Sequence, residues 1–116
     1  MRSLITTARD LPTAPGSSVP NTNPPKVMIV SPPNCLSQPL VTGAGFPELD
    51  ELTRWLPELA KLYGELAIEQ DIYFADAAQF CEPDPVDGLH LDVENTRKLG
   101  IGIAEKIALE GFADFC

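Results

Sequence analysis

The only histidine of the chain, His90, follows Asp87 by three residues in the segment DPVDGLHLD, residues 84–92. A histidine that acts as a general base needs an acceptor for its second ring nitrogen, and a carboxylate three residues earlier can provide one across a tight turn. Gly88 favours such a turn. By spacing alone, however, Asp-x-x-His is more often a structural or surface turn than part of a catalytic site.

The same segment also has two metal-binding interpretations. In an EF-hand register Asp87 would stand at position five, but Pro83 and Pro85 would stand at positions one and three and offer no side-chain oxygen, which excludes a calcium loop. A transition-metal site built from His90, Asp87 and Asp92 stays open, although no other imidazole or thiolate lies nearby in the sequence.

The cysteines are odd in number and widely spaced, at Cys35, Cys81 and Cys116. They form no CxxC pair, so no zinc knuckle is expected, and reduced thiols are the simplest interpretation. A nucleophilic cysteine paired with His90 is conceivable, but nothing local marks any of the three as activated.

The composition describes one small acidic globular domain. The 116 residues are 44% hydrophobic, and 17 acidic against 8 basic residues give a formal net charge of -9. Such a surface repels phosphate backbones, so nucleic acid and anionic membranes are not expected as partners. No apolar run approaches the roughly 20 residues that span a membrane, and the N-terminus does not resemble a secretory leader, so a cytoplasmic location is expected.

The first part of the chain predicts a helix, a loop and a strand. Residues 2–11 place Leu4, Ile5, Ala8 and Leu11 at helical spacing. Residues 12–25 are rich in proline and predict a surface loop. Residues 26–31, KVMIVS, are apolar on both faces, which favours a buried parallel strand. Loop character continues over residues 35–46.

The strongest helical pattern covers residues 47–69. Pro57 lies inside it, which predicts a kink or two helices that meet there. Trp55 lies beside the apolar stripe and is expected in the core or at its rim. The residues that form this stripe recur at steps of three and four: Leu49, Leu52, Leu56, Leu59, Tyr63 and Leu66.

The last part predicts a strand over residues 71–76, a loop over 81–91 and a helix over 93–110. Asp92 is a good N-cap for this helix, and Gly111 suits its C-terminal end. Its buried face and its two glycines, which permit close packing, are Leu99, Ile103, Ile107, Gly100 and Gly102.

Strands that alternate with helices predict an α/β fold with a parallel sheet. Residues 1–116 are therefore expected to form a single partial α/β domain: a helix end over 1–11, a proline-rich loop over 12–25, and strand-helix-strand-loop-helix over 26–116. A sheet of only two strands leaves its edges and faces uncovered. The pattern indicates part of a larger layered structure.

Four segments resemble, in their order along the chain, the C-terminal part of the SGNH hydrolases, also called GDSL-type esterases and lipases. The last of them is the most informative. VDGLHLDVENTRKLGIGIAEKI, residues 86–107, resembles the family block in which Asp-x-x-His precedes a helix with a Leu-Gly step. KVMIVSPPN, residues 26–34, resembles the family strand that ends in a Pro-Pro pair. Residues 62–80 resemble the helix-to-strand segment between these blocks, and residues 1–10 resemble the end of the helix before the Pro-Pro strand.

The resemblance implies the C-terminal portion of a three-layer α/β/α, flavodoxin-like fold with a parallel sheet. It also implies roles for two residues: His90 as the general base and Asp87 as the acid that orients it. The reaction would be hydrolysis of carboxylic esters through an acyl-enzyme, with no metal or organic cofactor. In the family the nucleophile is a serine in an N-terminal Gly-Asp-Ser block, and the oxyanion donors come from that serine and from two further blocks.

The sequence departs from the family at the nucleophile. Gly-Asp-Ser and Gly-x-Asn-Asp blocks are both absent, and the serines stand in other settings. We therefore expect a segment that carries the base and orienter but is inactive alone, with an ester substrate only if an N-terminal half completes it. The serines are Ser3, Ser17, Ser18, Ser31 and Ser37.

Two other interpretations stay open. One is a non-catalytic interaction module, or a homo-oligomer, that pairs through the exposed sheet edge. The other is a half-domain of marginal stability with no function of its own, because half a domain buries too little apolar surface.

Overall fold

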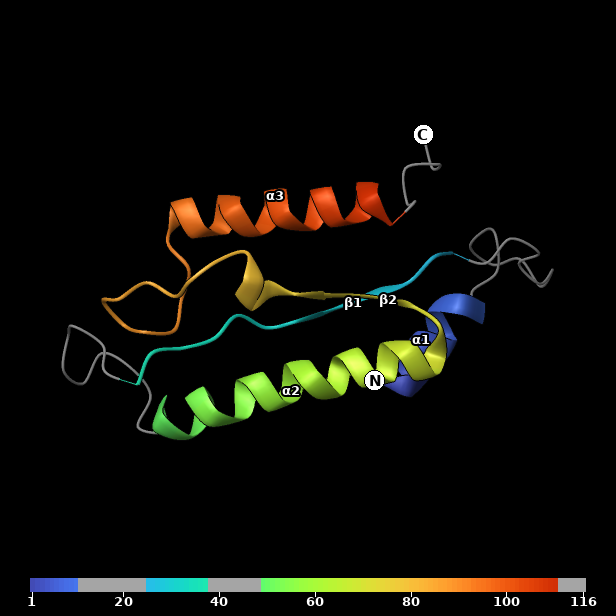
Figure 1. Ribbon diagram of the computed structural model, residues 1–116, viewed down its shortest axis with the longest axis horizontal. Helices are drawn as coiled ribbons and strands as arrows, with labels where there is room; N and C mark the ends of the chain where they lie inside the picture. The colour runs from blue at the N-terminus through green and yellow to red at the C-terminus, as the bar shows by residue number, and fades with distance from the viewer. Residues whose placement is uncertain (11–24, 38–48, 111–116) are drawn as a thin grey trace.

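In the computed structural model, helices and strands alternate as the sequence predicts, in three layers (Figure 1). The structure describes residues 1–10, 25–37 and 49–110; most of the loops predicted over 12–25 and 35–46 fall outside this part, as do Leu11, Gly111 and Cys116. The elements are α1 (Arg2–Asp10), β1 (Met28–Ser31), α2 (Leu49–Gln70), β2 (Tyr73–Asp76), the 3-10 turn η1 (Ala77–Gln79) and α3 (Val93–Leu109).

The two strands pair in parallel, which confirms the prediction from their apolar sequences. Met28 lies opposite Tyr73, and Ser31 lies opposite Asp76 at the other end of the pair. Ser31 is 0% exposed, and its hydroxyl donates to Asp76 Oδ1 over 2.9 Å. A buried hydroxyl is costly without a partner, so this hydrogen bond favours one register of the two strands.

Both strands are shorter than predicted: β1 begins at Met28, and β2 loses its first two predicted residues to the end of α2. Asp71 adopts a left-handed backbone conformation, with φ 53°, at the end of α2. The N–H of Ile72 then donates to the carbonyl of Ala67 over 2.9 Å, as at a helix C-terminus. Residues 71 and 72 therefore belong to the helix end, and β2 begins at Tyr73.

Helix α2 covers one face of the sheet and continues through Pro57. The alternative in which two helices meet at Pro57 is therefore wrong. The predicted stripe is confirmed, since none of its six members is exposed, whereas Trp55 is 64% exposed. No described helix, α2 included, is long and apolar enough to cross a membrane.

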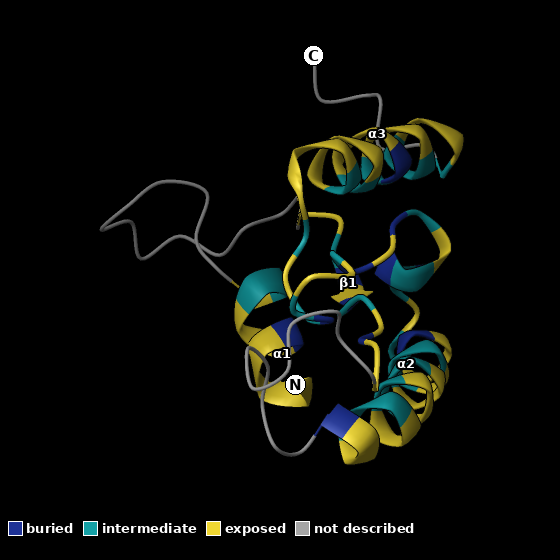
Figure 2. Cartoon of the chain, turned by 90° about the vertical axis from the view of Figure 1, so that its left-hand side faces the viewer, coloured by how far each residue is buried: buried dark blue, intermediate teal, exposed yellow. Residues whose placement is uncertain are grey.

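Helix α1 packs against the C-terminal part of α2 and completes the core on this face. The core is formed by Ile5, Ile29 and Ala67, with Tyr63 and Phe74 packed around it. Figure 2 shows buried positions on α1 and α2 where these helices face the strands. The expected stripe of α1 is wrong at Leu4, which is 65% exposed, because Ile5 alone points into the core.

Two arginines of α1 hold the end of α2. Arg9 donates to the carbonyl of Gln70 and, over 3.0 Å, to the carbonyl of Asp71. Arg2 forms an ion pair of 2.6 Å with Glu69. The last carbonyls of a helix have no partner within the helix, so the Arg9 guanidinium replaces those missing hydrogen bonds.

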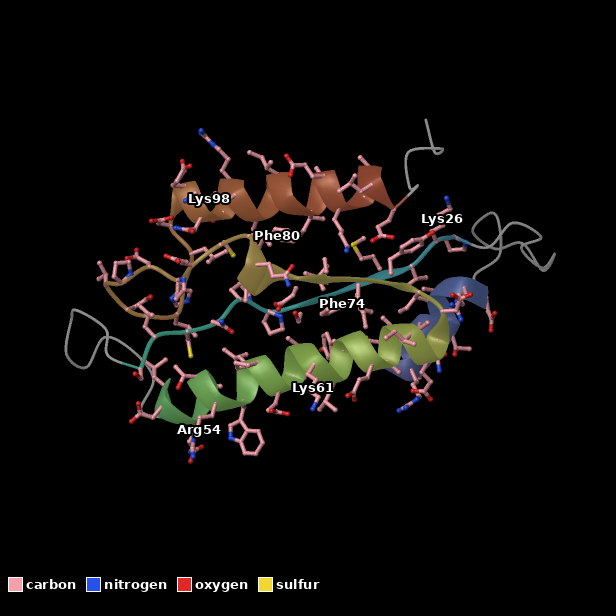
Figure 3. The ribbon with its side chains drawn as sticks, in the orientation of Figure 1. Lys26, Arg54, Lys61, Phe74, Phe80 and Lys98 are labelled. Atoms are coloured by element: carbon pink, nitrogen blue, oxygen red, sulfur yellow. The ribbon has the colours of Figure 1, made fainter. Side chains whose placement is uncertain are left out.

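Helix α3 covers the other face, and one aromatic side chain provides its main contact. Asp76 caps the turn η1 by accepting a hydrogen bond from the Ala78 N–H at 3.1 Å, and this turn places Phe80 toward α3 (Figure 3). Gly102, the one buried residue of α3, lies against the Phe80 ring. The sequence did not predict η1, although it did predict close packing at Gly102.

The α3 side of the sheet is incompletely covered. Val30 on β1 is 37% exposed, so the expectation that both faces of this strand are buried is wrong for this residue. Ile101 and Leu109 on α3 are 52% and 85% exposed. The described sheet has two strands and therefore two unpaired edges. The predicted incomplete α/β layer structure is confirmed.

The glycines of α3 offer a matched test of the contact between α3 and η1. A Cβ at Gly102 would lie 2.3 Å from Phe80 Cγ, whereas a Cβ at Gly100 would meet nothing within 4 Å. We expect Gly102→Ala to lower the free energy of unfolding by about 1–3 kcal/mol. Gly100→Ala should raise it by up to about 1 kcal/mol through helix propensity. Urea unfolding of both variants checks this, and equal effects would contradict the contact.

Candidate functional site

The Asp87/His90 turn is joined to the segment that follows β1. The N–H of Leu36 donates to the carbonyl of Gly88 over 2.8 Å. Within the turn, the Gly88 N–H donates to the Asp84 carbonyl and the Asp84 N–H to the His90 carbonyl, both over 2.7 Å. The turn therefore lies beyond the carboxyl ends of both strands, where open α/β sheets place their ligands.

Gly88 is required by two features of this junction. Its φ is +72°, a conformation that favours glycine. A Cβ at this position would also lie 2.8 Å from the carbonyl oxygen of Leu36. The predicted role of Gly88 in permitting the turn is confirmed, and the close approach to Leu36 adds a reason that the sequence does not reveal.

Asp87 uses both of its oxygens. Oδ1 accepts from the N–H of Leu89 at 2.9 Å and from the N–H of His90 at 3.0 Å, and Oδ2 lies 2.5 Å from Nδ1 of the His90 ring. These three hydrogen bonds stabilise the carboxylate. They lower the pKa of Asp87 to about 2, the Leu89 N–H most strongly and the His90 ring next.

The His90 ring is oriented by Asp87 and is otherwise open. The side chains of His90 and Asp87 are 74% and 24% exposed. With Nδ1 donating to the carboxylate, Nε2 of the neutral ring is an acceptor, as a general base requires. Among the described residues, Asp87 is the one side chain that hydrogen-bonds to this ring.

Asp92 and Asn95 tie the start of α3 to the loop. Asp92 Oδ1 accepts from the N–H of Asn95 at 2.7 Å and from its side-chain amide at 3.0 Å. These bonds lower the pKa of Asp92. Asn95 Oδ1 in turn accepts from the N–H of Glu82 at 2.8 Å. The predicted N-cap role of Asp92 is confirmed, and its carboxylate is directed toward α3.

The described serines offer His90 no partner. Ser31 is buried and bonded to Asp76, on the side of the sheet occupied by α2. Ser3 lies in α1, and Ser37 makes no hydrogen bond to the ring. Ser17 and Ser18 fall outside the described residues.

The cysteine and metal alternatives find no support in the described part of the chain. Cys35 and Cys81 are free and buried, and burial raises the pKa of each. Raised pKa values oppose a nucleophilic thiolate. No described group of three His, Cys, Asp or Glu side chains could hold a metal ion, so the site proposed from His90, Asp87 and Asp92 is not formed.

A pocket of about 440 Å³, which we call the rim pocket, lies between the segments that follow β1 and β2. Its lining includes Leu36, which is bonded to Gly88, and Pro85, two residues before Asp87. Its lining residues are Asn34, Cys35, Leu36, Ala78, Cys81, Glu82, Pro83 and Pro85.

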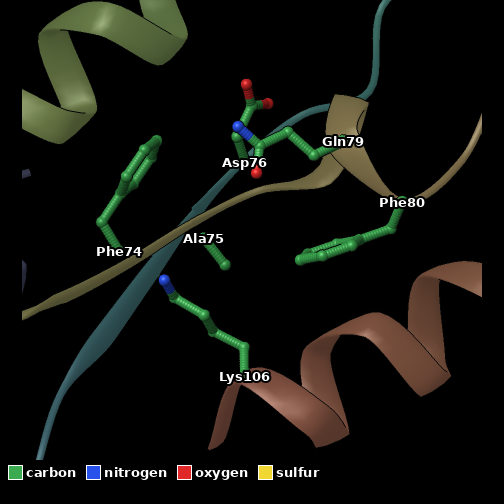
Figure 4. Close-up of a pocket in the computed structure, with 6 residues that line it drawn as sticks. All are labelled: Phe74, Ala75, Asp76, Gln79, Phe80 and Lys106. Carbon is green, nitrogen blue, oxygen red and sulfur yellow. The ribbon is translucent and has the colours of Figure 1, made fainter. Parts of the chain in front are cut away.

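A smaller cavity of about 150 Å³ lies between β2 and α3 (Figure 4). Lys106 points into it from α3, and Phe80 closes its other side. Lys106 Nζ is paired with Glu110 at 3.0 Å. None of the lining residues belongs to the Asp87/His90 turn, so we assign this cavity to the packing of α3.

Comparison with solved structures connects this geometry to esterases. A carbohydrate acetylesterase family member from Sinorhizobium meliloti is 28% identical, with a TM-score of 0.73, over 93% of this chain and 48% of that chain. The M. smegmatis aryl esterase is 30% identical, with a TM-score of 0.73, over 94% of this chain and 48% of that chain. Neither a family model nor a curated protein matches the chain.

These matches fit the resemblance expected from the sequence. The chain spans about half the length of the esterases that it matches, and almost all of the chain is used in the match. The expected SGNH-type fold and the expected correspondence to part of the domain are thereby confirmed.

The hydrogen bonds of Asp87 predict its titration. Carboxyl-detected NMR should give a midpoint near the pKa of about 2. In His90→Ala the midpoint should rise but stay below the ordinary value, because the larger contribution of the Leu89 N–H remains. Because the pKa of Asp87 is lower in the folded than in the unfolded chain, its ionisation stabilises the fold at pH values above the unfolded-state pKa. This stability is lost as the pH falls through the folded-state pKa. A midpoint at the ordinary value would contradict the geometry.

Proposed function

The chain corresponds to part of an SGNH-type hydrolase domain, and we propose that in a complete domain His90 and Asp87 act as the base and orienter of carboxylic ester hydrolysis. The observation that supports this role is the 2.5 Å contact of Asp87 Oδ2 with His90 Nδ1, beside an exposed imidazole. The esterase names of the matched structures support the reaction class.

The chemistry follows from the orientation of the ring. Nε2 of His90 takes the proton of a serine hydroxyl as the serine oxygen attacks the ester carbonyl. The imidazolium formed is stabilised by Asp87, whose pKa of about 2 keeps it ionised at neutral pH. His90 then gives the proton to the leaving alcohol, and water hydrolyses the acyl-enzyme by the same transfers in reverse. These steps involve no metal or organic cofactor.

The nucleophile has to come from outside the described residues. Ser31 is buried, and neither Ser3 nor Ser37 bonds to His90. We propose that the serine and the oxyanion donors belong to the half of the domain that this chain does not match. A base without a nucleophile gives little catalysis, because the groups of a triad act as a unit.

A second candidate function is an interaction module that pairs through its sheet edge. The two-stranded sheet has unpaired edges among the described residues, and Val30 is exposed beside one of them. Such an edge is a template for another strand. The partner would be a second copy or the complementary half of an esterase domain.

Assays of the isolated chain test the proposed absence of a nucleophile. Purified residues 1–116 should hydrolyse a short-chain aryl ester no faster than the His90→Ala variant does. His90-dependent turnover well above background would contradict the proposal, because it would require a nucleophile within this chain.

Complementation tests the roles of the two residues. The chain is mixed with a polypeptide that supplies the remaining half of the matched aryl esterase, and ester turnover is measured. His90→Ala should lower turnover by about 10⁶ and Asp87→Asn by about 10⁴, the sizes known for triads in serine proteases. Asp92→Asn, which alters a nearby carboxylate bonded to Asn95, is the control and should retain activity. Equal turnover in all three variants would show that Asp87 and His90 form only a turn.

Light scattering tests the second candidate function. If the sheet edge pairs with a second copy, the parent chain should elute as a dimer, and Val30→Lys should shift it toward the monomer because charged edges oppose pairing. Lys98→Glu, on the outer side of α3 (Figure 3), is the control for an altered surface charge. A well-folded monomer at high concentration would contradict pairing between copies.

A further inference from the structure

One side chain of α3, Asn95, joins the two ends of the loop that carries the proposed base. We call residues 82–92 the His90 loop. Asn95 Oδ1 accepts from the N–H of Glu82, the first residue of the loop, at 2.8 Å. The side-chain amide of Asn95 donates to Oδ1 of Asp92, the last residue of the loop, at 3.0 Å. The ends of the loop therefore lie close together, as in compact surface loops that pack as a unit.

The direction of the Asn95 amide follows from the chemistry of its two partners. A backbone N–H can only donate, so the amide oxygen faces Glu82. An ionised carboxylate can only accept, so the NH2 group faces Asp92. Asp92→Asn keeps an acceptor oxygen, so the amide keeps its direction in that variant. The hydrogen bond to Glu82 thus joins the start of α3 to the start of the loop.

A second contact anchors the middle of the His90 loop. The N–H of Leu36, in the segment after β1, donates to the carbonyl of Gly88 over 2.8 Å. The backbone hydrogen bonds of Asp84, by contrast, lie inside the loop: its N–H donates to the His90 carbonyl and its carbonyl accepts from the Gly88 N–H. These inner bonds maintain the shape of the loop. Its place relative to the sheet depends on contacts that leave the loop, at Leu36 and at Asn95.

Asn95 is a suitable anchor because α3 is itself held in place. Asn95 lies in the first turn of α3 and is half-buried. Further along the helix, Gly102 packs against the ring of Phe80. An amide on a packed helix is a rigid support for a neighbouring loop, whereas a Glu82 N–H without this acceptor would turn to water and release the start of the loop.

We propose that Asn95 is a positioning residue for His90, and that it keeps the His90 loop in one place relative to the sheet by accepting from the Glu82 N–H. Asp87 orients the ring within the loop, and Asn95 places the loop as a unit. The side-chain hydrogen bonds of Asn95 go to the two ends of the loop, so Asn95 acts through the loop. The inference rests on the proposed function, which makes His90 the base, but the placement of the loop can be measured without catalysis.

Amide hydrogen exchange of Leu36 reports whether the loop is in place, although Leu36 is distant from Asn95 in the sequence. Asn95→Ala should speed the exchange of Leu36 about fivefold, because one hydrogen bond that holds the loop is lost. The amide of Gly88, bonded inside the loop, should exchange at the parent rate. Gly100→Ala is added to every chain, including the reference, because it strengthens α3 without a new contact and keeps the variants folded.

Thr96→Ala is the matched control. Thr96 lies in the same turn of α3, and its hydroxyl donates to the carbonyl of Asp92 over 2.7 Å, so this variant also loses one side-chain hydrogen bond. That bond does not hold the Glu82 N–H, and the exchange of Leu36 should stay at the parent rate. Equal exchange of Leu36 in the two variants would overturn the proposal. Loss of folding in Asn95→Ala alone would also overturn it, because Asn95 would then support the whole fold and not the loop.

Turnover of the complemented domain tests the consequence for catalysis. Asn95→Ala should lower kcat by about 10- to 100-fold and leave KM unchanged. A misplaced base slows acylation and deacylation alike, whereas the contacts that bind the ester are retained. A role in stability alone would reduce the amount of folded domain, and kcat per folded domain would equal the parent value. Thr96→Ala should retain both kcat and KM.

The two measurements separate this inference from the proposed function. His90-dependent turnover with an unchanged kcat in Asn95→Ala would overturn the inference and leave the proposed function standing. A parent domain without His90-dependent turnover would refute the proposed function, and with it the role of Asn95 in catalysis. Faster exchange of Leu36 in Asn95→Ala would in that case still establish that Asn95 holds the loop.

Discussion

The parallel pairing of β1 with β2 fixes the position of every other described element. Ser31 and Asp76 lie opposite each other at the carboxyl ends of the strands, and their side chains are hydrogen-bonded in the interior. A shift of one residue would bury the hydroxyl without its partner and move the apolar side chains to the wrong face. Because this register holds, both strands end at the same level.

Three features are positioned by the point at which both strands end: the turn η1, the segment after β1 and the Asp87/His90 turn. Asp76 caps η1 and so directs Phe80 toward α3. The segment after β1 continues to Leu36, where it meets Gly88. The turn with Asp87 and His90 is thus held by the backbone of two chain segments that are distant in sequence, which is a firmer support for a reactive side chain than an isolated surface loop.

Sequence reasoning succeeded where periodicity or local chemistry determines the structure. The stripe of α2, the cap at Asp92 and the Asp87/His90 contact all depend on residues a few positions apart. It failed where a distant part of the chain decides. The shortening of β2 depends on how α2 ends at Asp71, and the rim pocket depends on the approach of two loops. Neither has a local pattern, so neither could be read from spacing.

The exposure of Val30 also depends on distant parts of the fold and not on its local sequence pattern. An apolar strand is expected to be buried on both faces, but burial requires covering elements, and on the face of the two-stranded sheet opposite α1 and α2 the described residues supply α3 alone. The chain spans about half the length of the esterases that it matches, and we expect the elements that would cover Val30 to belong to the half that it does not match.

The chain matches only about half of these esterases, but the local geometry of Asp87 and His90 does not depend on the other half. The carboxylate is held by two backbone N–H groups of its own turn, and that turn is held by Leu36. All of these contacts lie within this chain, so orientation of the imidazole does not depend on the unmatched half. Catalysis by the proposed mechanism would depend on it, because an oriented base lowers no barrier until a hydroxyl lies within reach of Nε2. In the proposed function, two requirements of a triad would therefore be met by different parts of the domain: Asp87 would orient the base within this chain, and the nucleophile would come from the half that the chain does not match.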